Sequence, residues 1–269
     1  MTETALLHAL EQITTAFERK EIPFAIYIDL SKAFDSLDHD ILLQKLEHYG
    51  IRGILHNWFE SYLSGRNQYT CFKGTNSDVL PITCGVPQGS ILGPLLFLVY
   101  VNDVVNTSHL FRFIMYADDI NILVSHPEKG KLNDVVNNEL QTVCDWFKAN
   151  RLQMNSSKTK YMIFQSSKSK SSHTNLPIYA DGKAISRVAS INFLGVIIDD
   201  RLSWKNHINH IHGKISISIG MLYKLRVLLP KKTLFMLYNA LVLPYLDFCN
   251  LIWLGATEHD LNRLTALQI

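Results

Sequence analysis

The chain has 269 residues, of which 47% are hydrophobic and 19% are charged. That content suffices for one large domain or two subdomains. The net charge of +2 is too small to indicate nucleic-acid binding by itself. The longest apolar stretch, residues 91–101, is too short to cross a bilayer and is predicted to be a core helix.

The four cysteines, Cys71, Cys84, Cys144 and Cys249, form no Cys-x-x-Cys pair. This pattern is typical of reduced, mostly buried thiols in an intracellular protein. The N-terminus lacks the positively charged leader of a secreted protein. We therefore expect a cytoplasmic or nuclear protein that is neither secreted nor held in a membrane.

The first half of the chain alternates helices and strands. Apolar spacing predicts a helix over residues 3–19, and a continuous apolar run predicts a buried strand that ends at Asp29. Asp38 is expected to cap a helix that Gly50 closes. The later predicted elements are a helix over 51–63, a hairpin of 68–73 with 79–84, a helix from Ser90 to near Val105, a hairpin over 111–124 and a helix over 131–150.

The second half changes from mixed structure to helices near residue 200. A strand over 161–164, a Ser/Lys-rich loop over 166–175 and strands at 176–179, 184–187 and 191–198 are predicted. Ser203 is expected to cap a helix that runs to Leu222, with Pro230 in the first position of the next helix and Pro244 kinking or ending that one. We therefore divide the chain into residues 1–200 and a helical part, 201–269.

Two adjacent acids, Asp118 and Asp119, interrupt two β-prone apolar runs and are predicted to lie at the turn of a hairpin. Asp is common in turns because its side chain bonds its own backbone, so a structural role is the alternative. Neighbouring buried carboxylates repel each other unless a cation lies beside them, and Mg²⁺ prefers oxygen ligands. Asp29 and Asp118 could together hold two Mg²⁺ ions (Mn²⁺ being possible), with Asp119 as an auxiliary ligand.

Five segments occur in the order found in one family. Residues 29–35, 85–90 and 116–119 resemble the first three palm motifs of reverse transcriptases, in the form that non-LTR retrotransposons carry. Residues 146–160 resemble the fourth motif, and residues 193–199 resemble the fifth, the primer grip. The resemblance implies an α+β fold: a polymerase palm with an antiparallel sheet covered by helices, followed by a helical thumb-like part.

The resemblance also implies an activity and its partners. An RNA-directed DNA polymerase adds deoxynucleotides to the 3′-hydroxyl of a DNA primer on an RNA template, and the reaction uses two metal ions. Asp29, Asp118 and Asp119 would be its catalytic metal ligands. Lys158 would protonate the departing pyrophosphate, although a solvated surface lysine is an equal alternative. The oligomeric state is left open.

Three residues are expected at the substrate. By resemblance, Phe34 packs under the sugar of the incoming nucleotide and excludes a 2′-hydroxyl; an ordinary core phenylalanine is the alternative. Gln88 would hydrogen-bond the nucleotide or template, and Gly89 would allow close backbone approach; a plain helix start is the alternative. Asp35 and Asp38 are interpreted as turn and cap residues.

Basic residues spread along the chain are candidates for nucleic-acid binding, with a solvated surface as the alternative. They are Arg66, Arg112, Lys148, Arg151, Lys205, Lys214, Lys224, Lys231 and Lys232. The helical part carries aromatic residues among them, which suits a thumb that grips a duplex. A zinc site at His207, His210 and His212 is disfavoured, because they do not share one helix face and have no cysteine partners.

Only 28 residues precede Asp29, whereas the family carries a basic fingers region there. We therefore expect the chain to begin inside the helix that joins fingers to palm, and the thumb-like part to be incomplete. A catalytically inactive retrotransposon remnant that folds and binds nucleic acid is the alternative function. An RNA-copying polymerase is a weaker third option, because Phe34 leaves little room for a 2′-hydroxyl.

Overall fold

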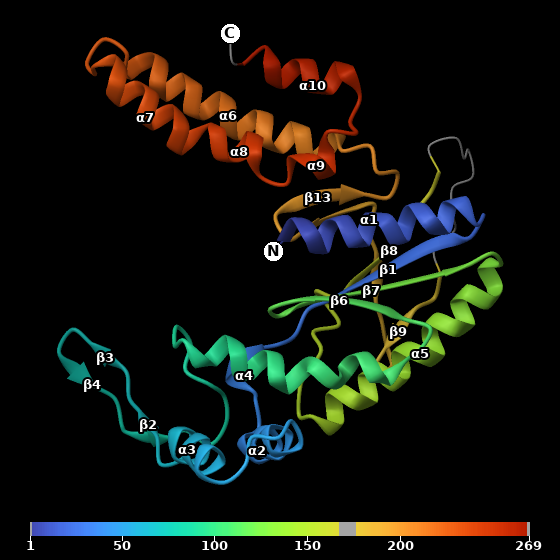
Figure 1. The fold of residues 1–269 in the computed structure, drawn as a ribbon, viewed down its shortest axis with the longest axis vertical. Helices are drawn as coiled ribbons and strands as arrows, with labels where there is room; N and C mark the ends of the chain where they lie inside the picture. Colours follow the sequence, from blue (N-terminus) through green and yellow to red (C-terminus); the bar gives the residue numbers. More distant parts are fainter. Residues whose placement is uncertain (1, 167–175, 268–269) are drawn as a thin grey trace.

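The computed structural model describes residues 2–166 and 176–267. Its centre is a five-stranded sheet in the order β11-β8-β1-β7-β6, with helices on both faces (Figure 1). These strands are β1 (Ile22–Ile28), β6 (Arg112–Tyr116), β7 (Asp119–His126), β8 (Lys160–Ile163) and β11 (Ser186–Arg187). The mixed α+β class predicted from the sequence is confirmed.

Every strand pair in this sheet is antiparallel except one. β1 pairs with β7 and β8, and β6 pairs with β7, all antiparallel, whereas β11 runs parallel to β8. A parallel pair needs a long crossover connection, and the chain between β8 and β11 is long enough to supply one. The predicted antiparallel sheet is thus present in β6, β7, β1 and β8, and the edge strand β11 departs from it.

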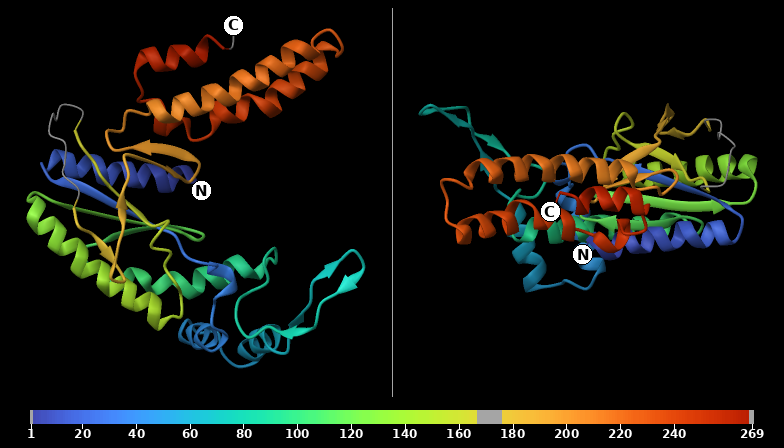
Figure 2. Two further views of the ribbon diagram at one scale, coloured as in Figure 1. Left: turned by 180° about the vertical axis from the view of Figure 1, so that it is seen from behind. Right: turned by 90° about the horizontal axis from the view of Figure 1, so that it is seen from above.

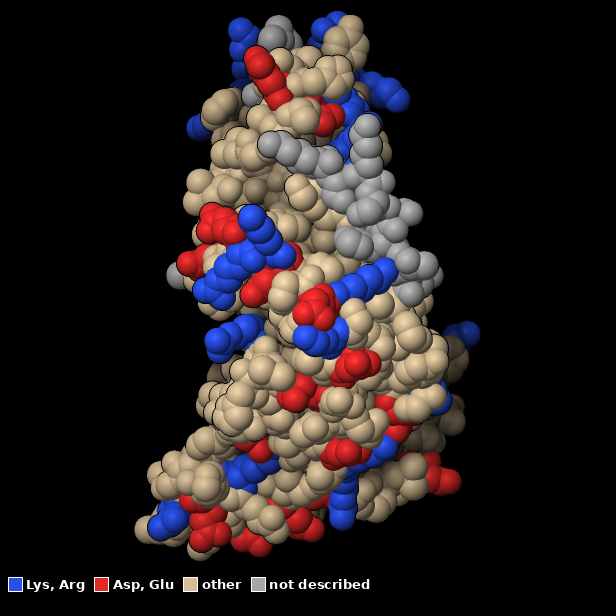
Figure 3. Space-filling view, turned by 90° about the vertical axis from the view of Figure 1, so that its right-hand side faces the viewer, with Lys and Arg blue, Asp and Glu red and all other residues tan. Residues whose placement is uncertain are grey.

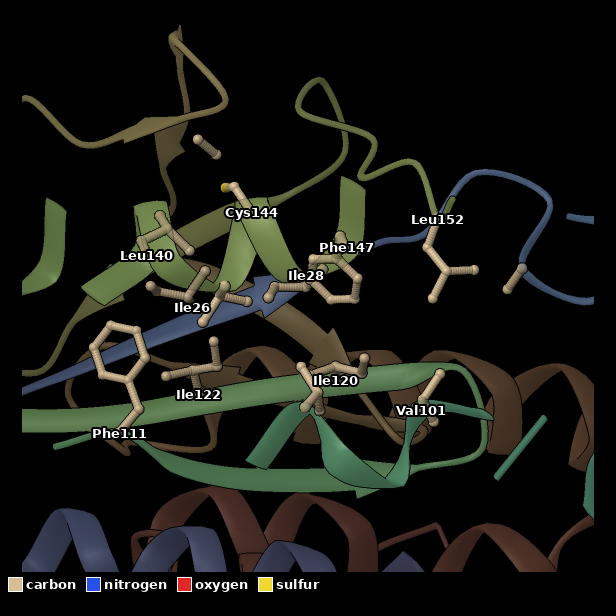
Figure 4. Close-up of a cluster of buried hydrophobic side chains, with 14 of the residues drawn as sticks. Ile26, Ile28, Val101, Phe111, Ile120, Ile122, Leu140, Cys144, Phe147 and Leu152 are labelled. Atoms are coloured by element: carbon tan, nitrogen blue, oxygen red, sulfur yellow. The ribbon is translucent and has the colours of Figure 1, made fainter. Parts of the chain in front are cut away.

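Both faces of β1 are buried, which explains its continuous apolar sequence. Phe24, Ile26 and Ile28 point into one core, whereas Ala25 and Tyr27 point into a second core on the opposite face. In the first core, Ile26 and Ile28 lie close to Leu140 and Phe147 (Figure 4). The second core joins the sheet to helices from both ends of the chain.

The first core is covered by helices that lie between Asp29 and residue 150. They are α2 (His39–His48), α3 (Ile54–Leu63), α4 (Leu92–Val101), the 3-10 helix η2 (Asn102–Thr107) and α5 (Lys129–Ala149). Asp38 caps α2, since its carboxylate accepts a hydrogen bond from the Ile41 N–H at 3.0 Å. Gly50 follows that helix with a φ of 90°. Both predicted helix ends are confirmed.

The predicted hairpin between α3 and α4 forms a slender arm. Two short ladders build it, β2 (Asn67–Gln68) with β5 (Leu80–Pro81) and β3 (Cys71–Phe72) with β4 (Thr75–Asn76). All eight strand residues are exposed. We call residues 67–81 the hairpin arm; it projects from the body beside α3 (Figure 1).

The second core contains α1 (Thr2–Glu18), the predicted N-terminal helix, and a hairpin of β12 (Ser190–Phe193) with β13 (Val196–Asp199). The prediction of one strand over 191–198 is wrong. Leu194 and Gly195 have φ values of 50° and 84° and turn the chain back. A side chain on Gly195 would meet the Phe248 ring at 2.9 Å, so glycine is needed there. A small hairpin, β9 (Tyr179–Ala180) with β10 (Lys183–Ala184), precedes it.

Helices complete the chain after residue 204. They are α6 (Lys205–Leu225), α7 (Lys231–Leu241), α8 (Leu243–Asp247), α9 (Asn250–Trp253) and α10 (Glu258–Thr265). Pro244 lies in the first turn of α8 just after α7 ends, so the predicted interruption is confirmed. Pro230 was predicted to be the first residue of the helix that follows it, but it lies one residue before α7 begins. Ile208, Ile211 and Ile215 of α6 pack in the second core together with residues of α1. The division into two domains at residue 200 stays a prediction.

Ser203 does not cap α6. Trp204 occupies the cap position with a φ of 62°, and its backbone N–H donates to the buried Asp199 carboxylate at 2.9 Å. The same carboxylate accepts hydrogen bonds from the backbone N–H groups of Arg201 and Ser203, each at 3.1 Å. Asp199 therefore organises the turn into α6, a role that sequence reasoning did not assign.

The structure also bears on the predictions for the cysteines, the Ser/Lys-rich loop and membrane-spanning helices. Cys144 and Cys249 are buried but Cys71 and Cys84 are exposed, so "mostly buried" is wrong for half of these thiols, all of which are free. Residues 167–175 of the predicted Ser/Lys loop lie outside the described residues. Among the helices in the described part of the chain, none has the length and apolarity to cross a membrane.

Candidate active site

Three acids reach the same end of the central sheet. Ile28 at the end of β1 pairs with Ile120 of β7, so Asp29 and Asp119 are the next residues at that end of the two strands. Tyr116 pairs with Asp119, which leaves Ala117 and Asp118 as a two-residue turn between β6 and β7. Ala117 takes a left-handed φ of 52° to close it. The predicted hairpin with acids at its turn is thus present.

The three carboxylates interact electrostatically. The pKa of the Asp119 carboxyl is raised, first by partial burial and then by the negative charges of Asp118 and Asp29. Such a set of hard oxygen donors, one of them partly desolvated, has the chemistry that suits Mg²⁺. Among the described residues, however, no three His, Cys, Asp or Glu side chains converge closely enough to form a ready-made metal centre.

Lys158 lies beside Asp29. Its ammonium nitrogen is 4.0 Å from the Asp29 carboxylate, and its side chain is 70% exposed. The segment before β8 is tied to this strand end, because the Asn155 N–H donates to the Asp29 carbonyl at 2.8 Å. The Asp29 N–H in turn donates to the Thr159 hydroxyl at 3.3 Å. Lys158 thus reaches the acids, and its chemical role stays a prediction.

A small cavity of about 140 Å³ connects the acids with the β12–β13 hairpin. Asp29, Asp119 and Lys158 line one side, and residues 191–193 of β12 line the other. The ring of Phe193 packs edge-on against Tyr27 at 5.5 Å, which fixes the hairpin to β1. The fourth and fifth motifs predicted from sequence therefore border the same site as the first and third.

The loop before α4 is docked onto the segment after Asp29. The Gly85 N–H donates to the Leu37 carbonyl at 2.7 Å, and the Val86 N–H donates to the Phe34 carbonyl at 2.9 Å. A side chain on Gly85 would lie 2.7–2.9 Å from backbone atoms of Asp35. Close backbone approach within the protein thus occurs at Gly85, a role that sequence reasoning gave to Gly89.

Phe34 and Gln88 lie on the two sides of this junction. The half-buried Phe34 ring packs on Phe97 of α4 at 4.8 Å between ring centres. The exposed Gln88 amide donates to the Asp35 carboxylate at 2.9 Å. Gly89 has a φ of 80° with open space around it. Contact of Phe34, Gln88 and Gly89 with a substrate stays a prediction.

The basic candidates lie in four separate parts of the structure. Arg151 forms an ion pair with Asp38, and Lys148 forms ion pairs with Asp181 and Asp145. Both side chains remain largely exposed, so phosphate binding by either stays a prediction. Arg112 opens β6 at the end of the sheet far from the acids. The lysines of the helical part are all exposed, at positions Lys205, Lys214, Lys224, Lys231 and Lys232. Arg66 is half-buried at the base of the hairpin arm.

His207 is a core residue. Only 2% of it is exposed, and its ring nitrogen accepts a hydrogen bond from the Ile197 N–H at 3.3 Å. Burial, with a smaller contribution from His210, lowers the pKa of His207 to about 4. It is therefore neutral at physiological pH and stabilises the junction between β13 and α6.

A helix-covered sheet that presents acids at a hairpin turn is the palm arrangement of template-dependent polymerases. The profile of the reverse transcriptase (RNA-dependent DNA polymerase) family matches residues 2–198. The chain belongs to the reverse transcriptase family.

Curated relatives come from insect mobile elements. The chain is 26% identical over 280 residues to the probable RNA-directed DNA polymerase from transposon X-element of Drosophila melanogaster, covering 99% of this chain and 30% of that protein. It is 28% identical over 277 residues to the corresponding polymerase from transposon BS of the same species, covering 96% of this chain and 29% of that protein. The chain thus spans about three tenths of the length of these relatives.

Solved structures share the fold. A telomerase from Candida albicans, in complex with an RNA fragment, superposes with a TM-score of 0.52 at 13% identity, over 99% of this chain and 50% of that one. An apo telomerase from Candida tropicalis gives a TM-score of 0.51 at 13% identity, over 74% of this chain and 38% of that one. At these identities the similarity establishes a polymerase fold and nothing finer.

Proposed function

We propose that this chain is the palm and part of the thumb of a non-LTR retrotransposon polymerase, which extends a DNA primer with deoxynucleoside triphosphates on an RNA template. The observation that carries the proposal is the meeting of Asp29, Asp118 and Asp119 at one end of the sheet, beside Lys158 and β12. Family membership and the curated relatives give the reaction class.

Divalent metal ions complete the proposed site. Asp29 and Asp118 would hold two Mg²⁺ ions, or Mn²⁺ in their place, and Asp119 would add an auxiliary oxygen. When bound, the ions supply activation of the primer hydroxyl and stabilisation of the leaving phosphates. The raised pKa of Asp119 supports this assignment: partial burial raises it first and the negative charges of Asp118 and Asp29 add to the rise, and a bound cation would offset both.

The chain's own side chains have separate proposed tasks. Lys158 donates a proton to the departing pyrophosphate from its place beside Asp29. Phe34, which packs against Phe97, lies under the sugar of the incoming nucleotide and disfavours a 2′-hydroxyl. In the loop before α4, Gln88 hydrogen-bonds the nucleotide or the template, and Gly89 allows close backbone approach.

The helical part is proposed to hold the primer–template duplex. Exposed lysines on α6 and α7 provide positive charge for backbone phosphates. Tyr223 is exposed between them, and the Arg226 guanidinium stacks over its ring at 3.7 Å. A palm followed by helices that contact a duplex accounts for both halves of the chain.

Primer extension tests the proposal. The chain is incubated with a DNA primer on an RNA template, deoxynucleotides and Mg²⁺. We expect extension that Asp118→Asn reduces by at least about 1000-fold, while Asp134→Asn, at an exposed position on α5, leaves it intact. Binding of the hybrid without extension would instead favour the inactive remnant.

A further inference from the structure

The hairpin arm carries large apolar side chains that the rest of the described chain does not cover. Tyr69 is 57% exposed and Phe72 is 70% exposed, and Val79 and Leu80 are exposed by 61% and 62%. The right-hand face of the molecule, by contrast, has positive and negative side chains spread across it (Figure 3). Aromatic and aliphatic side chains gathered on one projecting element are typical of a surface that contacts another protein.

The arm is also short of strands. Its two ladders contain two residue pairs each. An isolated two-stranded hairpin is marginally stable at best in water, whereas three or more strands with an apolar face are stable. Helix α3, which leads into the arm, leaves Ile54, Leu55 and Trp58 exposed. Further strands beside the arm, and a cover for these side chains, would therefore stabilise it.

The two edges of the arm differ in their protection against strand pairing. The returning strand, residues 75–81, contains Asp78 and ends at Pro81, which has no N–H to donate. Charged residues and proline are the usual devices that keep an edge strand from pairing. The outgoing strand, residues 67–72, contains no proline, glycine or charged residue. We call the free side of residues 67–72 the open edge.

Alternate residues direct their backbone groups toward the open edge. Inside the arm, the Ser77 N–H donates to the Thr70 carbonyl at 2.9 Å, and at its base the Ile82 N–H donates to the Arg66 carbonyl at 2.8 Å. Inward and outward groups alternate along an antiparallel strand, so the outward residues are Asn67, Tyr69 and Cys71. Within residues 2–166 and 176–267, no other segment hydrogen-bonds to the backbone of these three.

We propose that the arm joins two copies of this chain, with residues 67–71 of one copy pairing antiparallel with the same residues of the second copy. Antiparallel pairing of identical strands has two-fold symmetry, the commonest symmetry of homo-oligomers. All three outward residues find partners only when Tyr69 lies on the two-fold axis. Tyr69 then lies opposite Tyr69 of the second copy, and Asn67 lies opposite Cys71. The two arms become one four-stranded sheet, separate from the acids of the active site.

The same register accounts for the side chains. The two Tyr69 rings become direct cross-strand neighbours on one face of the joined sheet. On the other face, Arg66 of each copy lies opposite Phe72 of the other copy. Aromatic pairs and a cation beside a ring both stabilise such neighbours. Arg66 forms no ion pair with any described residue, and it is the one charged residue in the sequence from 66 to 72, so like charges are not directly opposed.

A second copy fits these features better than a nucleic acid does. Free backbone N–H and C=O groups along a strand are recognised by another extended polypeptide. Residues 64–83 carry two basic side chains and one acid, which is little positive charge for binding phosphates. The arm also projects clear of the sheet and its helices in every view, so a second arm can lie beside it (Figures 1 and 2).

Sedimentation velocity tests for the dimer. The 269-residue chain is treated with nuclease and examined from about 1 to about 100 µM, a range in which interfaces of modest area associate. We expect a dimer whose proportion rises with concentration. Tyr69→Asp places two carboxylates on the axis and should weaken association at least about 10-fold, and Arg66→Gln should weaken it less. Tyr179→Asp, at a ring 50% exposed on β9, should leave the dimer unchanged.

A disulfide tests the register. The Cα atoms of a hydrogen-bonded antiparallel pair are about 5.5 Å apart, which a disulfide can span. Under mild oxidation, Asn67→Cys should therefore link to the free Cys71 of the second copy, as mass spectrometry of the joined peptides would show. Thr75→Cys, on the returning strand, should form no such link. A misfolded arm cannot imitate this result, because the link must appear at one chosen pair of positions.

Several outcomes contradict the dimer. A chain that stays monomeric at every concentration overturns the proposal, whatever other partner the arm then binds. A dimer that Tyr69→Asp leaves intact overturns it as well, because the copies would meet elsewhere. Association seen only before nuclease treatment would reveal a nucleic-acid bridge in place of paired arms. Equal cross-linking of Asn67→Cys and Thr75→Cys would contradict the register on which the pairing depends.

Discussion

At the scale of single residues, the position of Asp119 lowers the stability of the folded chain. Asp119 stands partly desolvated between two further negative charges, which raises its carboxyl pKa. A carboxyl whose pKa is raised by folding destabilises the native state once it ionises, so stability is lost as pH rises above its ordinary pKa. A bound cation would remove that cost.

Asp119→Asn should therefore stabilise the metal-free chain at neutral pH. We expect a midpoint of thermal unfolding a few degrees higher than that of the wild type, and a smaller rise in midpoint when Mg²⁺ is added. Calorimetry with and without Mg²⁺ measures both effects, and the exposed acid changed as Asp78→Asn serves as the control. A lower midpoint for Asp119→Asn would show that the carboxylate is satisfied within the protein.

Phe34 can be tested by sugar selection. Phe34→Val removes the ring that packs on Phe97, and we expect discrimination against ribonucleotides to fall by about 10-fold or more. Single-nucleotide incorporation gives the ratio of kcat/KM for matched deoxy- and ribonucleotides. Phe113→Val, another half-buried ring on the same core, is the matched control. An unchanged ratio would show that Phe34 has only a structural role in the core.

At the scale of elements, sequence patterns located most helices and strands, but they missed features set by tertiary contact. The apolar run over 191–198 looks like one strand, yet the Leu194–Gly195 turn folds it into a hairpin because Phe248 packs there. Likewise, Ser203 has the right identity for a helix cap, but the buried Asp199 carboxylate binds the backbone instead. Both outcomes depend on partners that the local pattern of residue types does not specify.

The position of the acids was easier to predict from the sequence than the packing of the loops around them. The acids follow β-prone runs, so their shared sheet edge follows from strand pairing. By contrast, the docking of Gly85 on Asp35 depends on how the loop before α4 crosses the chain after Asp29. The sequence around a glycine does not tell whether another part of the backbone lies against it. A positive φ or a close neighbour is nevertheless the usual reason for a glycine at a given position.

Gly85→Ala should damage this junction. The added methyl group would overlap the Asp35 backbone in a left-handed conformation, so we expect the free energy of unfolding to fall by about 2 kcal/mol or more. Gly130→Ala, at a helical position with open space around it, should be neutral or slightly stabilising. Urea denaturation measures the free energy of unfolding of both variants and of the wild type. Equal stability of Gly85→Ala and the wild type would mean that the loop can move away from Asp35.

At the scale of the whole molecule, the sheet carries one helical extension from its second core and the hairpin arm from its first. Both extend past the acid-bearing end of the sheet (Figure 2). A primer–template that passed this end would meet lysines on one side and the arm on the other. The lysine-bearing helices and the arm therefore lie on either side of the acid-bearing end of the sheet.

Duplex binding should depend steeply on salt. Lys224→Gln, Lys231→Gln and Lys232→Gln together should weaken binding of a blunt RNA–DNA hybrid. They should also flatten the plot of log affinity against log salt, by a little under one unit of slope for each lysine that no longer neutralises a phosphate. A control variant changes two lysines at the start of α5, as Lys129→Gln with Lys131→Gln, outside the helical part. Identical slopes for the wild type, the triple variant and the control would show that the lysines of the helical part face solvent and bind no phosphate.

The central claim is that Asp29 and Asp118 hold the catalytic metal ions at the end of the sheet. Anomalous X-ray scattering from crystals grown with Mn²⁺, a primer–template and a non-reactive deoxynucleotide locates these ions directly. The account predicts two peaks about 4 Å apart between Asp29 and Asp118, both absent in Asp118→Asn. Manganese elsewhere on the chain, or carboxylates that face different sides of the sheet with no ion between them, would contradict it.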